Sequence, residues 1–107
     1  MLRKLNWQAY TNGDRNKTIE EVKAIISNND GCIMNFNMFS DLALSLSIEI
    51  EENKIPALHS TLSEILKVSG LKENVNPDST KDWLIFINIS FSSGKGELKR
   101  EVPAVPG

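Results

Sequence analysis

The stretch Gly31–Glu52, GCIMNFNMFSDLALSLSIEIEE, decides the fold of this chain. Its second half alternates strictly, with apolar side chains at every even position from Leu42 to Ile50 and small or acidic side chains at the odd positions. A period of two predicts a strand with one buried face. The first half, Cys32–Phe39, alternates more loosely, and Ser40-Asp41 between the halves predicts a tight turn. The stretch therefore predicts a β-hairpin.

The segments before and after this hairpin supply its cover and its neighbours. Residues 2–11 alternate as a first strand and end at the turn signal Asn12-Gly13-Asp14. Apolar residues recur at helical spacing from Ile19 to Ile26, which predicts a first helix capped by Asn16 or Thr18. Pro56 suits the first turn of a second helix, which we expect to run to about Gly70.

The last third of the chain predicts a loop and two strands. Residues 71–82 are polar and predict a loop of about a dozen residues. Trp83–Phe91, WLIFINISF, is the most apolar run, and its β-branched and aromatic residues predict an interior strand. Residues 97–102 predict a last strand beside it, and residues 103–107, with two prolines at 103 and 106, predict an extended tail.

These elements follow the order β-α-β-β-α-β, with one strand added. With right-handed crossovers, this order predicts an α+β ferredoxin-like sandwich: one antiparallel sheet, two helices on one face and an extra C-terminal edge strand. The first and third strands would be central and the second would lie at an edge. Strand 83–91 would pair with the extra strand at the other edge. A length of 107 residues and a mass of 12.0 kDa indicate a single domain, 1–107.

The same succession of elements over residues 2–91 resembles an ACT domain, the small ligand-sensing module of amino-acid metabolism. ACT domains usually carry a proline-glycine pair or a glycine at the turn that opens the first helix. Gly13, in the turn Asn12–Lys17, is approximately in that place, and the proline is missing. The resemblance implies a regulatory module that senses an amino acid.

Composition narrows the classes of partner. The net charge of −2 and a pI of about 5.4, with basic residues spread along the chain, argue against nucleic acid as a partner. No apolar run reaches the roughly 18 residues that a membrane helix needs. The opening residues MLRKLNWQAY do not read as a signal peptide, so we expect a cytoplasmic protein. With one cysteine, Cys32, expected to be buried, and one histidine, we expect no metal site and no cofactor.

Alternation also predicts which residues lie on the face of the sheet that the helices leave open. The expected residues are Asn6, Gln8, Tyr10, Ile33, Asn35, Asn37, Phe39, Ser45, Ser47, Leu84, Phe86, Asn88 and Ser90. Charge is nearly absent from this set, whereas a face meant for bulk water usually carries lysine and glutamate. We therefore expect this face, or the sheet edges, to form a homodimer or a higher homo-oligomer. An ordinary solvated face is the alternative.

The segment Gly13–Thr18, GDRNKT, is the best candidate for a small-ligand site. It precedes a helix N-terminus, where unpaired N–H groups and the helix dipole favour an anion. The predicted anion-binding residues are Gly13, Arg15, Asn16, Lys17 and Thr18. The alternative is that the segment serves only as a turn and a cap.

An enzymatic role is the less favoured hypothesis. Acylphosphatases share the ferredoxin-like order and bind phosphate at this loop, and Arg15 with Asn35 or Asn37 would correspond to their site, but their glycine- and glutamine-bearing motif is missing. The only histidine, His59, has no nucleophile or carboxylate at a suggestive spacing, so no catalytic residue is predicted. We expect a small non-enzymatic, self-associating domain that senses an amino acid or a small anion. A scaffold module without a ligand is the alternative.

Overall fold

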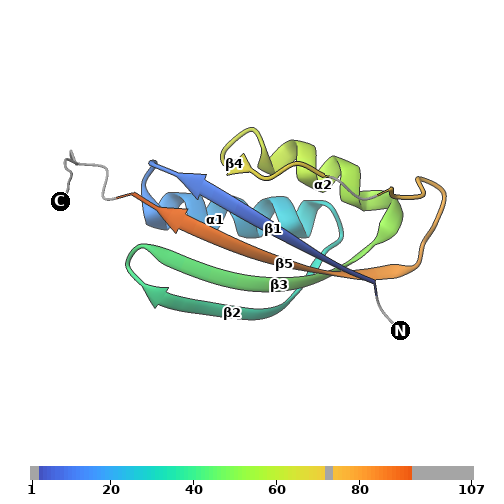
Figure 1. Cartoon of the computed structure of the whole chain (residues 1–107), viewed down its shortest axis with the longest axis horizontal. Coiled ribbons are helices and arrows are strands. Elements are labelled where there is room, and N and C mark those ends of the chain that lie inside the picture. The colour runs from blue at the N-terminus through green and yellow to red at the C-terminus, as the bar shows by residue number, and fades with distance from the viewer. Residues whose placement is uncertain (1–2, 72–73, 93–107) are drawn as a thin grey trace.

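The computed structural model describes residues 3–71 and 74–92 of the chain. Its elements, in chain order, are β1 (Arg3–Thr11), α1 (Arg15–Asn28), β2 (Cys32–Ser40), β3 (Ala43–Glu51), a 3-10 turn η1 (Glu52–Lys54), α2 (Ile55–Leu62), β4 (Lys67–Val68) and β5 (Asp82–Phe91). The five strands form one sheet in the order β2-β3-β5-β1-β4, and two α-helices accompany it (Figure 1). The predicted α+β class is confirmed.

The place of β5 differs from the ferredoxin-like prediction. β5 lies between β3 and β1, antiparallel to β3 and parallel to β1 over nine residue pairs, from Arg3 with Trp83 to Thr11 with Phe91. The sheet is therefore mixed and not antiparallel, and strand 83–91 is not at an edge. The physical reason is the burial of β5: its odd residues lie in the core and Leu84 and Phe86 on its other face are half-buried. A strand that is buried on both faces belongs inside a sheet.

The fifth strand is also not the predicted one. The predicted strand at residues 97–102 and the tail at 103–107 lie outside the described residues. In its place, the sheet gains the short strand β4 beside β1, in a stretch predicted to be helical. α2 ends earlier than predicted, at Leu62, where the hydroxyls of Thr61 and Ser63 donate to the carbonyls of Ala57 and His59 at 2.9 and 2.8 Å. Such local bonds compete with the helix ladder and favour its end.

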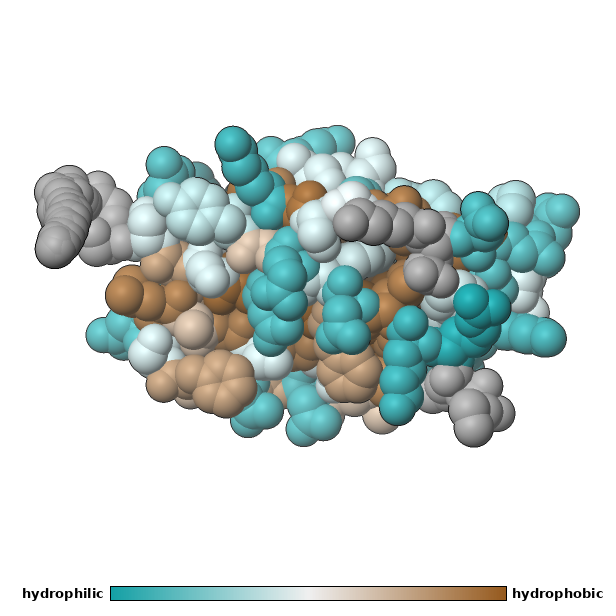
Figure 2. All heavy atoms as spheres, viewed as in Figure 1, coloured by the Kyte–Doolittle hydropathy of each residue, from teal (hydrophilic) through white to brown (hydrophobic). Residues whose placement is uncertain are grey.

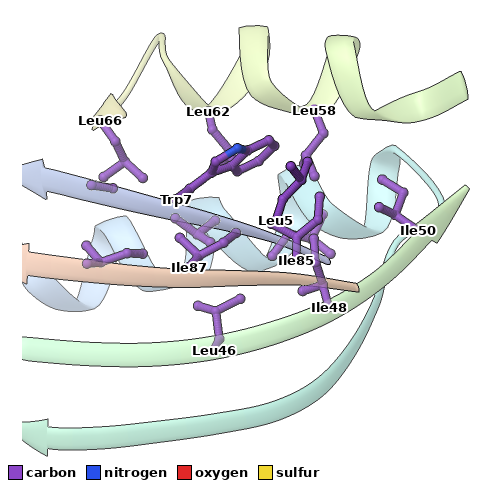
Figure 3. Close-up of a cluster of buried hydrophobic side chains, with 14 of the residues drawn as sticks. Leu5, Trp7, Leu46, Ile48, Ile50, Leu58, Leu62, Leu66, Ile85 and Ile87 are labelled. Carbon is purple, nitrogen blue, oxygen red and sulfur yellow. The ribbon is translucent and has the colours of Figure 1, made fainter. Parts of the chain in front are cut away.

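Both helices cover one face of the sheet, and the core lies between them and it. The sheet contributes the odd residues of β1 and β5 and the even residues of β3 to the buried cluster: Leu5, Trp7, Ala9, Leu44, Leu46, Ile48, Ile50, Trp83, Ile85, Ile87, Ile89 and Phe91. Helix α1 contributes Val22 and Ile26, and α2 contributes Ile55, Leu58 and Leu62. Figure 3 shows Leu58 and Leu62 of α2 pointing at Trp7. The alternation predicted for β1, β3 and β5 is confirmed.

Strand β2 departs from the predicted alternation. Ile33 pairs with Ile48 and packs against the core, whereas Met34 lies in a register shift and is 53% exposed. The bulge at this point turns Ile33 towards the helices, away from the open face predicted for it. Cys32 is exposed and not buried, because β2 is the outermost strand. The hairpin turn is Asp41-Leu42, one residue later than predicted, since Ser40 pairs with Ala43.

The end of α1 explains why a glycine precedes β2. Gly31 donates its N–H to the carbonyl of Ile26 at 2.8 Å, and Asp30 takes a left-handed conformation with φ of 62°. This is the Schellman pattern of helix ends. A Cβ on Gly31 would lie 2.8 Å from Cγ2 of Ile26, so the close approach of the chain to the helix requires glycine here.

Glu52 holds the loop that leads into β5. The side chain is buried, and its Oε2 accepts the backbone N–H of Asn76 at 2.6 Å. The backbone N–H groups of Glu52 and Asn53 donate to the carbonyls of Lys81 and Ser79 at 2.8 and 2.9 Å. The described part of the loop is therefore fastened to the end of β3.

The same contacts lower the pKa of the Glu52 carboxyl. The hydrogen bond from the Asn76 backbone is the largest cause, hydrogen bonds from Ser79 and Trp83 and the positive charge of Arg3 act in the same direction, and desolvation opposes them. Each of these groups favours the ionised carboxylate.

We predict that Glu52→Gln makes stability less sensitive to acid. Because the pKa is lower in the folded than in the unfolded chain, the carboxylate stabilises the fold above the unfolded value of about 4.5, and this contribution is lost as the pH falls through the lowered pKa. Urea unfolding between about pH 3 and about pH 7 should show a shallower acid decline for Glu52→Gln than for the unsubstituted protein. Glu51→Gln, the same charge change one residue earlier, serves as the control. Equal acid slopes for Glu52→Gln and the unsubstituted protein would contradict the assignment.

Candidate functional site

The open face of the sheet carries two rows of uncharged side chains. Cross-strand pairing aligns Asn6, Phe86, Ser47 and Asn35 in one row, and Gln8, Asn88, Ser45 and Asn37 in the next. A neutral amide stands at both outer positions of each row. These eight predicted residues lie on the predicted face, whereas Ile33 lies on the helix side and Phe39 lies in a register shift.

Charge on this face is confined to its margins. Lys4 and Glu49 flank Leu84 in the row beside Asn6, Glu51 pairs with Asp82 at the start of β5, and Lys67 of β4 pairs with Tyr10. In Figure 1, β1 and β5 pass in front of α1, so the view is of the open side. Figure 2, in the same view, shows polar side chains interleaved with apolar ones. The centre of the face carries no charge, but it is not fully open to solvent, because Ser47 is buried and Phe86 is half-buried.

The exposed apolar side chains gather on the hairpin of β2 and β3. Among the described residues, six large hydrophobic side chains are exposed, and five of them, which we call the hairpin patch, are Met34, Phe36, Met38, Phe39 and Leu42. The sixth, Tyr10, lies on β1. Eight of the nine residues of β2 are exposed, and none carries a charge. An exposed apolar cluster of this kind marks an interaction site more often than scattered single residues do.

The hairpin patch is exposed because α1 covers only the inner part of β2. The Nζ of Lys23 lies 5.1 Å from the ring centroid of Phe36, and Phe36 is still 37% exposed. Beside Met38, a shallow groove of about 420 Å³ separates the start of α1 from the hairpin. Phe36 is not among the residues predicted for the open face, and its pairing with Leu46 places it on the helix side, where it is still exposed.

The predicted anion site is occupied by groups of the chain itself. Asp14 caps α1, its Oδ2 accepts the N–H of Lys17 at 2.8 Å and its carbonyl accepts the N–H of Thr18 at 2.9 Å. The sequence predicted Asn16 or Thr18 as the N-cap of α1, and this prediction is wrong, because the cap is Asp14. A carboxylate already lies where an anion would meet the helix N-terminus.

One of the two cations of this segment, Arg15, is also paired. Nη1 of Arg15 lies 2.8 Å from Oδ1 of Asp41 in the hairpin turn, and the N–H of Gly13 donates to Oγ1 of Thr11 at 3.0 Å. Thr18 is buried, whereas Asn16 and Lys17 are exposed. The structure brings the five predicted residues together, but an anion would compete with Asp14 and Asp41. Anion binding stays a prediction.

The residues of the acylphosphatase comparison lie on different sides of the sheet. Arg15 begins α1, on the helix side, whereas Asn35 and Asn37 pair with Ser47 and Ser45 and so point to the open side. An antiparallel pair keeps opposite side chains on the same face, so the sheet separates the arginine from both amides.

His59 makes contacts that connect elements of the fold. Its Nε2 lies 2.7 Å from the carbonyl oxygen of Ser69, and its ring meets that of Trp7 edge-on, with centroids 5.0 Å apart and planes at 73°. The contacts join α2 to β1 and to the residue after β4. Sequence reasoning missed them because Trp7 is remote along the chain and Ser69 lies in a stretch predicted to be helical.

Among the described residues, no group of three histidine, cysteine, aspartate or glutamate side chains is placed to hold a metal ion. Within the same ranges, no helix combines the length and the apolar character needed to cross a membrane.

Comparison with known proteins leaves the chain without an assigned family. No protein-family model matches it, and neither a curated protein nor a solved structure does. The resemblance to ACT domains therefore stays an expectation.

We predict that His59→Ala lowers the free energy of unfolding by about 1–3 kcal/mol, the usual cost of a half-buried hydrogen bond and its packing. Urea unfolding followed by circular dichroism measures the change. Ser60→Ala, at the exposed neighbouring position on α2, is the matched control and should stay within about 0.5 kcal/mol of the unsubstituted protein. A His59→Ala variant as stable as Ser60→Ala would show that the contacts to Ser69 and Trp7 do not support the fold.

Proposed function

We propose that this chain is a small non-enzymatic domain that self-associates through its sheet, as a homodimer or a higher homo-oligomer. The observation that carries the proposal is the hairpin patch, which lies beside two rows of uncharged residues on the open face. Interface cores are depleted in charge and enriched in aromatic residues and methionine. The hairpin patch contains two of each.

The reactive side chains support a non-enzymatic role through their engagement in the fold. His59 contacts Ser69 and Trp7, and Arg15 pairs with Asp41. Glu52, whose pKa is lowered, holds the loop before β5. Each of these groups has a structural partner that accounts for its position.

The exposed apolar area suits a reversible association. At about 150–250 Å² per aromatic side chain, Phe36 and Phe39, 37% and 72% exposed, offer together roughly 200 Å² in each copy. Burying roughly 400 Å² in a symmetric pair contributes on the order of 10 kcal/mol at about 25 cal/mol per Å². The loss of translational and rotational freedom costs about 4–15 kcal/mol. At the low end of that cost the net free energy of association is about −6 kcal/mol, which corresponds to a weak, reversible pair with a Kd of tens of micromolar.

Ligand sensing and an ACT-like regulatory role remain predictions attached to Gly13–Thr18, and a scaffold without a ligand is the alternative. A thermal-shift screen of amino acids and small anions separates the two, because a ligand at about 100 times its Kd adds roughly 2.7 kcal/mol of stability. Arg15→Ala, which removes one of the two cations of the segment, tests whether any shift arises there.

We predict a concentration-dependent rise in mass from 12.0 kDa towards twice that value. Sedimentation equilibrium between about 1 μM and about 500 μM covers the expected range of Kd. Because the proposed contacts are apolar, association should persist in about 1 M salt, where exposed ion pairs are screened. A chain that remains monomeric throughout this range would remove the proposal.

A further inference from the structure

We propose that two copies of this chain join edge to edge, through antiparallel pairing of their β2 strands, so that the two sheets form one continuous sheet. The inference rests on the proposed self-association and specifies its surface and its symmetry.

The two edges of the sheet are built differently. On the β1 side, β4 pairs with Ala9 and Tyr10, and Ser69 bonds to both backbone groups of Gln8 through its hydroxyl and its N–H. The remaining part of β1 begins with the cations Arg3 and Lys4. Short covering strands and charges are the usual protection against edge-to-edge pairing.

The β2 edge has neither protection in the described part of the chain. β2 is the outermost strand, it is nine residues long, and it contains no charged residue. In Figure 2, apolar side chains reach the lower margin of the molecule, where Figure 1 places β2. An exposed edge of this length and composition is a template for another strand.

The bulges in β2 present apolar side chains at that edge. Met34 and Phe39 lie at the two register shifts against β3. At 53% and 72%, they are the most exposed large hydrophobic side chains in residues 3–71 and 74–92. A bulge re-aims a side chain, and bulges occur both at sheet edges and next to functional sites. Between the shifts, the segment from Asn35 to Met38 pairs regularly with β3, so its outer backbone groups form a regular ladder for a partner strand.

A second copy fits this edge because the edge is self-complementary. A two-fold axis perpendicular to the sheet, near Phe36 at the middle of β2, makes the strands antiparallel and keeps both helix layers on the same side. Phe36 and Met38 then meet apolar side chains, while Asn35 and Asn37 meet amides on the open side. Because β2 carries no charge, no like charges come together across the axis.

The size of the contact agrees with the affinity expected above. Nine residues at about 3.4 Å each extend for about 30 Å, and a sheet layer is about 10 Å thick, so each copy buries about 300 Å². The total of about 600 Å² falls below the roughly 1,200 Å² of stable interfaces, in the range of weak, transient ones.

Stacking of the two open faces is the rival arrangement, and cysteine cross-linking distinguishes it. In a Cys32→Ser background, single cysteines replace Asn35, Phe36, Asn37 or Met38, and Ser45→Cys and Asn88→Cys serve as open-face controls. Directly opposed residues on paired strands have Cβ atoms about 4.5–5.5 Å apart, so the residue at the axis should link to its own copy.

Under mild oxidation, the β2 cysteine nearest the axis should form covalent dimer at least about tenfold faster than either open-face control. Dominant linking through Ser45→Cys or Asn88→Cys would overturn edge pairing in favour of face stacking. Equal rates at all six positions would overturn it as well.

Charged substitutions give an independent test. Met34→Lys combined with Phe39→Lys places two cations on each edge, and we expect the dimer Kd to rise by at least about tenfold, or 1.4 kcal/mol. Tyr10→Lys is the matched control, because Tyr10 is also exposed and apolar but lies on β1, beyond β3 and β5. Its Kd should change by less than about twofold.

The outcomes separate this inference from the proposed function. If the unsubstituted chain is monomeric, the proposed function and the inference both fail. If it associates, but the double variant associates equally well or Tyr10→Lys abolishes the dimer, edge pairing fails while self-association stands. Circular dichroism checks that the variants fold. If the double variant does not fold, the cross-linking rates decide whether the copies pair edge to edge.

Discussion

The parallel pairing of β1 with β5 is the contact on which the rest of the structure depends. It joins nine residue pairs at the centre of the sheet and presents Leu5 and Trp7 beside Ile85 and Ile87 to the helices (Figure 3). With one side of β5 taken by β1, β3 takes the other, and β2 is left outermost. The hairpin patch lies on this outermost strand and in the turn that follows it.

Much of the local structure could be predicted from alternation and composition. The hairpin, the existence of both helices and the buried faces of β1, β3 and β5 follow from apolar periodicity, because periodicity reports which side of an element meets the core. It does not report which strand lies next to which. The apolar character of Trp83–Phe91 predicted an interior strand correctly, whereas the ferredoxin-like order placed the same strand near an edge. The direct evidence of composition was the better guide.

The candidate site was only partly accessible to sequence reasoning. The uncharged centre of the open face follows from alternation, but the partners of Arg15 and His59 do not. Asp41 is 26 residues from Arg15, and Trp7 lies on β1, far along the chain from the helix α2 that carries His59. The hairpin patch was missed because the apolar residues of β2 resemble core residues. A usable signal was present: the second strand was expected at an edge, and it contains no charged residue to protect it.

The central strand pair also has a consequence for how the chain is made. Arg3 pairs with Trp83, so the middle of the sheet joins residues 80 positions apart, and closing so long a loop is slow and entropically costly. During synthesis, β5 is the last of the described elements to leave the ribosome. Until then the hairpin can form locally, but the apolar face of β3 cannot be buried against β5. Hydrophobic surface that stays exposed during synthesis is what chaperones bind and protect.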